Sequence, residues 1–128
     1  MTTTHFVRVA QDLESAGLIW RPEIGDEITD RERREMVSIL VDPQGMTPSE
    51  LRQTYLWLPT IEQIVLQLES RQAVLQHTGL EMNESTLGYK TIIQTAMGDI
   101  ETLAESFRLS LALGLKEFLL AVDTRNYH

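Results

Sequence analysis

Carboxylates crowd one short stretch of the chain, between residues 26 and 35. Hard cations such as Ca²⁺ and Mg²⁺ bind carboxylate oxygens, so metal-dependent hydrolysis would be sought here first. The D-x-D-x-D-G spacing of a calcium loop does not occur, and interleaved arginines offset the negative charge. We interpret the stretch as a solvated hairpin loop and keep a small carboxylate- or metal-dependent hydrolase as an alternative. The acidic residues are Asp26, Glu27, Asp30, Glu32 and Glu35, and the arginines are Arg31, Arg33 and Arg34.

Histidine, cysteine and serine form no catalytic pattern. The sequence has no cysteine, and His5, His77 and His128 lack the H-x-x-H or H-E-x-x-H spacing of metal ligands. Ser106, His77 and Asp99 have the residue types of a nucleophile, a base and an orienting acid, but Ser106 lies outside a G-x-S-x-G turn. Glycine-rich phosphate loops do not occur either. We predict no catalytic, cofactor-binding or metal-binding residues and no cofactor.

Large apolar side chains are the remaining candidates, and their chemistry is that of a protein interface. Tryptophan is enriched at interface hot spots. Residues 107–122 contain so many leucines and phenylalanines that a helix there is apolar on more than one face. Soluble monomers rarely expose such a patch, so the sequence predicts a homodimer or higher oligomer unless the first hairpin or the helix after Pro59 covers it. The candidate interface residues are Trp20, Trp57, Leu109, Leu113 and Leu120.

The elements that must position these side chains begin with a helix. Its apolar stripe runs from Phe6 to Ala16, and Gly17 follows as a left-handed C′ residue. Residues 23–28 indicate a turn entering a strand, residues 30–35 a charged connection, and residues 36–41 a second strand. Together these segments predict a β-hairpin.

Two capping boxes mark the next helices. Thr47 with Glu50 begins the first, which is expected to run to about residue 55, and Thr60 with Gln63 begins the second. Alternating apolar residues then predict an antiparallel meander, and Ser106 caps a last helix. The three meander strands are expected at residues 73–81, 89–96 and 100–105.

These elements predict an α+β fold, in which an antiparallel β-sheet packs against helices and an N-terminal helix and β-hairpin precede it. The 128 residues favour one domain, 1–128. Within it, residues 1–46 form the helix and hairpin segment, and residues 47–122 form a helix-meander-helix core.

Charge and hydropathy narrow the function classes. The formal net charge of −8 disfavours nonspecific nucleic-acid binding. No apolar run approaches the ~20 residues that span a bilayer, so no membrane partner is expected. A basic stretch followed by an apolar signal region is not visible, and we therefore expect a soluble cytoplasmic protein.

Two motifs in residues 57–122 resemble a type of small protein encoded by phages, prophages and bacterial genomes. Residues 57–64 resemble the aromatic residue and Pro-Thr-x-x-Gln-Leu that open a helix in those proteins. Residues 104–117 resemble their Tyr-Glu-Thr-Tyr-like entry to a helix with an Ala-Leu-x-x-Gly-Leu step. The resemblance implies an α+β sandwich and carries no reaction.

Three functions remain open. We expect most a noncatalytic protein-interaction module, which binds a protein partner or itself. An acidic inhibitor or antitoxin-like protein that occupies a basic partner is compatible with the charge of −8. The third function is the hydrolase that would use the acidic stretch, and a concave pocket with convergent carboxylates would favour it.

Overall fold

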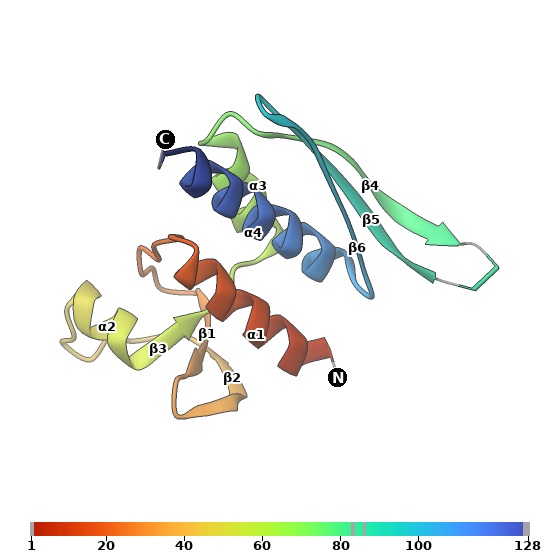
Figure 1. The fold of residues 1–128 in the computed structure, drawn as a ribbon. Helices are drawn as coiled ribbons and strands as arrows, with labels where there is room; N and C mark the ends of the chain where they lie inside the picture. The colour runs from red at the N-terminus through yellow and green to blue at the C-terminus, as the bar shows by residue number, and fades with distance from the viewer. Residues whose placement is uncertain (1, 83, 86, 127–128) are drawn as a thin grey trace.

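The computed structural model describes residues 2–82, 84–85 and 87–126, and the fold is α+β, as predicted. Four helices and six strands lie within these residues (Figure 1). The helices are α1 (Thr2–Ser15), α2 (Pro48–Thr54), α3 (Ile61–Glu69) and α4 (Phe107–Asn126). The strands are β1 (Glu27–Asp30), β2 (Arg33–Ile39), β3 (Tyr55–Trp57), β4 (Val74–Met82), β5 (Leu87–Thr95) and β6 (Gly98–Ala104).

The strands form two antiparallel sheets, with the orders β2-β1-β3 and β4-β5-β6. The sequence predicts the hairpin and the meander but not β3, which begins where the helix ends after Thr54. Strand β3 pairs Trp57 with Ile28 and Leu56 with Thr29 of β1. All four of these residues are buried, so pairing with β1 stabilises the extended backbone there. The sheet of residues 1–46 thus takes its third strand from the following segment.

The first hairpin is tighter than the charge pattern predicts. Strand β2 begins at Arg33, so residues 33–35 belong to the strand rather than to the connection. A register shift follows Thr29, whose hydroxyl lies 3.0 Å from the carbonyl oxygen of Arg34 and 3.1 Å from that of Met36. This hydroxyl binds the backbone of the bulge and holds the irregular turn.

Both capping boxes and the cap of the last helix form as predicted. The Thr47 hydroxyl accepts from the Glu50 amide, and the Glu50 carboxylate accepts from the Thr47 amide at 2.9 Å. Thr60 and Gln63 make the same exchange at the start of α3. The Ser106 hydroxyl accepts from the backbone N–H three residues further on, at 3.1 Å. The starts of α2, α3 and α4 are therefore fixed by contacts within four residues.

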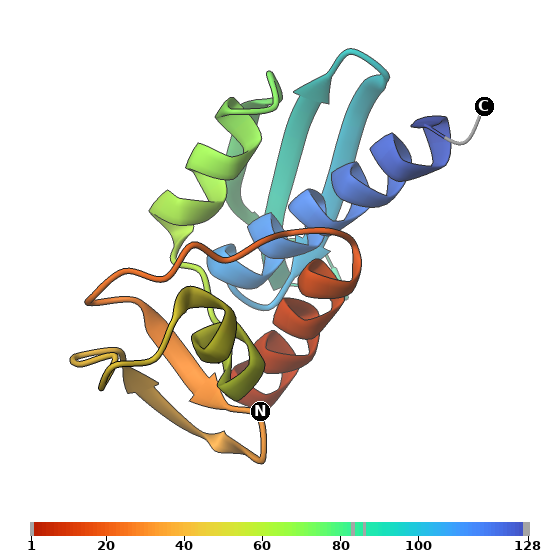
Figure 2. The same ribbon diagram turned by 90° about the vertical axis from the view of Figure 1, so that its left-hand side faces the viewer.

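Helix α4 lies at the centre of the molecule. The sheet β4-β5-β6 packs on one side of it, and α1 and α3 pack on others (Figures 1 and 2). Leu111 and Leu115 are fully buried, and a Cβ at Gly114 would lie 2.5 Å from Cδ1 of Ile93 in β5. Much of the apolar excess of residues 107–122 is thus covered within the chain by α1 and α3. The apolar surface of residues 107–122 therefore does not require a second subunit to cover this helix.

A hydroxyl cluster of Ser110, Thr91 and Thr102 fastens α4 to its sheet. The Ser110 hydroxyl donates to the Thr91 hydroxyl at 2.8 Å, and the Thr102 hydroxyl donates to the Ser110 carbonyl oxygen at 2.7 Å. Ser110 and Thr91 are both buried, so these bonds satisfy groups that water does not reach.

Candidate functional site

The five candidate interface residues do not share one surface. Trp20, Trp57 and Leu109 are buried within the chain, at 4%, 9% and 1% exposure. Leu113 is partly buried against the core, and Leu120 is 46% exposed. Burial of the first three by the chain itself leaves Leu120 as the exposed member of the set.

The acidic side chains of residues 26–35 do not form a cation site among the described residues. Asp26 is buried and points inward, where its carboxylate accepts from Trp20 Nε1 (2.8 Å), the Glu23 amide (2.9 Å) and Gln63 Nε2 (2.8 Å). Glu27 pairs with Arg108 at 3.2 Å. Among the described residues, no group of three or more histidine or acidic side chains has the arrangement of a metal site. We call Asp26 and its three donors the carboxylate hub, because it joins the loop after α1 to the start of α3.

The histidines and the Ser106, His77 and Asp99 trio are dispersed as well. Asp99 lies at the start of β6 and Ser106 beyond its end, roughly 20 Å apart at the rise of an extended strand. His77 is exposed on β4, and His5 lies 3.2 Å from a carboxylate oxygen of Glu105. His128 lies outside the described residues.

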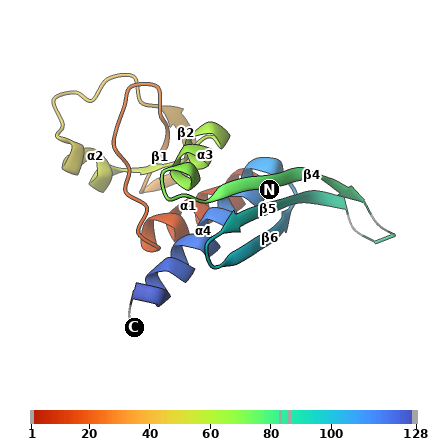
Figure 3. The same ribbon diagram turned by 90° about the horizontal axis from the view of Figure 1, so that it is seen from above.

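A projecting ribbon is the most distinctive surface of the molecule. The pairing of β5 with β6 ends at Tyr89, opposite Ala104, whereas the pairing of β4 with β5 continues to Met82, opposite Leu87. The ends of β4 and β5 therefore extend past α4 as two strands (Figures 1 and 3). An isolated two-stranded ribbon is marginally stable in water, so this one gains from contact with another surface.

The apolar side chains of the ribbon continue the core-facing side of its sheet. Side chains alternate along a strand, so Leu87 and Tyr89 share the face on which Thr91 meets α4. Leu80 and Met82 lie opposite Tyr89 and Leu87 and share this face too. Beyond the N-terminal end of α4 this face is exposed. The exposed fractions are 54% for Leu80, 75% for Met82 and 65% for Leu87.

The opposite face of the sheet carries charge. Lys90 of β5 lies 3.0 Å from Glu101 of β6 and 3.9 Å from Glu81 of β4. The hydrogen bond to Glu101, together with its negative charge, raises the pKa of Lys90. The ribbon is thus polar on the solvent side and apolar on the side that continues the core.

Strand β4 is also an edge of its sheet, and it carries few charges. Natural edge strands are commonly guarded by charges, bulges or short length. Strand β2 has three charged residues and pairs with β1 across a bulge, and β6 has two acids in seven residues. Strand β4 has nine residues, no proline and one charge, Glu81. It also has a bulge, between Leu75 and His77, which leaves residues 77–82 regularly paired with β5. The alternation of apolar residues predicts this strand. Its position at the edge follows from the strand order, which alternation within one strand does not reveal.

Comparison with protein-family models, curated proteins and solved structures finds no match to this chain. The resemblance to phage-type proteins stays a prediction. Among the described residues, no helix combines the length and the apolar character needed to cross a bilayer.

Proposed function

We propose that this protein is a noncatalytic protein-interaction module that works as a homodimer joined along β4. The observation that carries the proposal is the regular, lightly charged edge of residues 77–82 in β4, next to the exposed apolar side chains Leu80, Met82 and Leu87. An edge strand offers backbone N–H and C=O groups to another strand, and apolar contacts beside it add hydrophobic stabilisation.

The chemistry of β4 favours a second copy of this chain as the partner. Two identical strands pair antiparallel around a two-fold axis, which gives a closed, self-complementary interface. If the two-fold axis passes beside Gly79, residues at equal distances before and after Gly79 face each other. Glu81 of each copy then lies opposite His77 of the other copy. Both side chains lie on the polar face, so an acid meets an imidazole rather than a like charge.

Sedimentation equilibrium tests the proposal on the full chain. Between about 5 μM and about 200 μM, where micromolar affinities are resolved, the mass should rise from 14.6 kDa toward twice that value. Leu80→Lys places a charge on the interface face and should weaken the dimer at least about tenfold, because a lysine at an edge opposes pairing.

Leu103→Lys is the matched control. Leu103 is a leucine in the other edge strand of the same sheet, and its exposure of 52% is close to the 54% of Leu80. It pairs with Lys90 on the charged face, so the control adds the same charge away from the proposed interface. This variant should dimerise as the wild type does. A wild-type mass that stays at 14.6 kDa, or equal weakening by the two substitutions, would overturn the proposal.

A further inference from the structure

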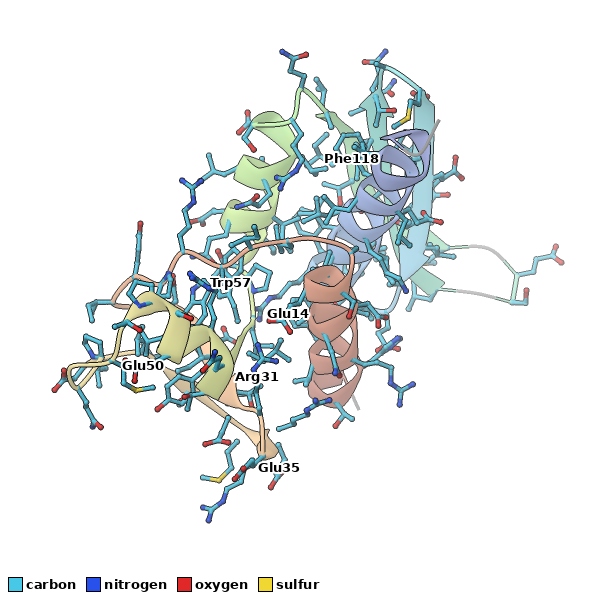
Figure 4. The ribbon with its side chains drawn as sticks, turned by 60° about the vertical axis from the view of Figure 1, so that its left-hand side comes forward. Glu14, Arg31, Glu35, Glu50, Trp57 and Phe118 are labelled. Carbon is cyan, nitrogen blue, oxygen red and sulfur yellow. The ribbon has the colours of Figure 1, made fainter. Side chains whose placement is uncertain are left out.

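A hollow lies away from β4, between the loop that follows α1 and helix α3. Its volume is about 790 Å³, within the range of small-molecule sites, and Trp57 forms part of its wall. Figure 4 labels Trp57 near the end of β3, on the side of the molecule that holds α2 and α3. We call this hollow the Trp57 cleft.

The indole of Trp57 contains a hydrogen-bond donor without an acceptor. Its side chain is about nine-tenths buried, and Nε1 has no partner among the described residues. Trp20, the other tryptophan, donates to Asp26 at 2.8 Å in the carboxylate hub. A buried donor that has lost water and gained no acceptor is unfavourable, so an acceptor delivered through the cleft would be bound.

The rim of the Trp57 cleft supplies cations and apolar surface. Arg21 and Arg71 both line the cleft. Arg71 donates through Nη1 to Gln67, and Arg21 is exposed. Ile19 and Leu66 also line it and are 67% and 62% exposed. The cleft has two carboxylates in its wall, exposed Glu23 and the Asp26 of the carboxylate hub, whose oxygens accept from three N–H groups.

We propose that the Trp57 cleft binds a small carboxylic acid with an apolar body. Its carboxylate accepts from Trp57 Nε1 and pairs with the guanidinium of Arg71 or Arg21, which prefer planar oxyanions. Its apolar body covers Ile19 and Leu66. Nε1 is covered by neighbouring atoms, so the proposed contact requires a rim side chain to rotate. The proposal does not involve β4 and stands apart from the dimer.

The two indole N–H resonances of the protein test this directly in solution. We would titrate ¹⁵N-labelled wild-type protein with octanoate, decanoate or 2-naphthoate, up to about 10 mM, tenfold above the Kd of a weak millimolar site. At least one acid should shift the Trp57 indole proton downfield and saturate, as a new hydrogen bond forms. The Trp20 resonance should stay in place, because Asp26 already holds its donor. Trp57→Phe assigns the two signals.

Matched probes and variants separate the chemistry from unspecific apolar binding. Octylamine, decylamine and 2-naphthylmethylamine keep the apolar bodies and reverse the charge, and they should leave the Trp57 resonance unchanged. Replacing both rim arginines, Arg21→Gln with Arg71→Gln, should weaken the acid at least about tenfold, as loss of a charge-assisted bond does, whereas Arg33→Gln with Arg34→Gln on β2 should not. Equal binding of acids and amines, equal shifts at both tryptophans, or no saturable shift with any acid would overturn the proposal.

Discussion

The two sheets are fastened to the rest of the molecule by different chemistry. The contacts that join β2-β1-β3 to neighbouring elements include carboxylates, namely the carboxylate hub of Asp26 and the pair of Glu27 with Arg108. Around β4-β5-β6 and α4 the buried contacts are the neutral hydroxyls of Ser110 and its neighbours.

This difference indicates how the surroundings of each sheet tolerate the loss of a polar group. A buried carboxylate with three donors leaves several N–H groups unpaired when it is removed. The hydroxyl groups that remain in a cluster can rotate their protons toward another acceptor. Removal of one hydroxyl should therefore lower the free energy of unfolding less. The contacts around β2-β1-β3 are therefore expected to be more sensitive to substitution than those around β4-β5-β6.

Asp26→Ala should give the largest effect. It removes the acceptor of two side-chain donors and one backbone N–H, and the free energy of unfolding should fall by about 3 kcal/mol. Urea denaturation followed by tryptophan fluorescence measures this. Asp26→Asn keeps one acceptor oxygen and should cost less. A loss below about 1 kcal/mol, the worth of a single neutral hydrogen bond, would contradict the role of the hub.

Ser110→Ala should have a smaller effect, about 1 kcal/mol in the same measurement, because it removes neutral hydrogen bonds to Thr91 and Thr102. Adding Thr91→Val replaces the hydroxyl that the first change leaves behind. The double variant should recover part of the stability, since apolar replacement of both partners is nearly neutral. A double variant that loses the sum of the two single losses would show that the hydroxyls act separately.

Acidification should give the smallest effect, at the α2 capping box. The hydrogen bond from the Thr47 amide, with that from its hydroxyl, lowers the pKa of Glu50. A lowered pKa in the folded chain stabilises the fold at neutral pH, and this contribution is lost as the pH falls through the folded value. Wild type should therefore melt slightly above Glu50→Gln at pH 7.

The difference between these two chains should shrink as the pH falls below the ordinary carboxyl range, through the lowered pKa of Glu50. The box at α3 uses Gln63 and does not titrate, so it provides an internal reference within the same protein. Thermal melts from pH 3 to pH 7 measure the difference. A constant gap between wild type and Glu50→Gln across this range would contradict the assignment.

Elements built from near neighbours in the chain were predictable from the sequence. Thr47, Thr60 and Ser106 bind amides three residues away, so their spacing alone fixes where three helices begin. Alternation likewise placed the strands of the meander to within a few residues of β4, β5 and β6. The α+β class follows from this order of elements.

Pairing and burial depended on residues far apart in the chain. Strand β3 exists because residues 55–57 meet β1, and the helical spacing before it gives no hint of that contact. Trp20 and Trp57 look alike in the sequence, yet one donates to Asp26 and the other has no acceptor among the described residues. The sequence by itself determined the helix starts and strand periodicity, which are local. Only the tertiary structure decided that α1 covers α4, that β4 lies at an edge and that the Trp57 cleft forms, because each depends on segments that approach after folding.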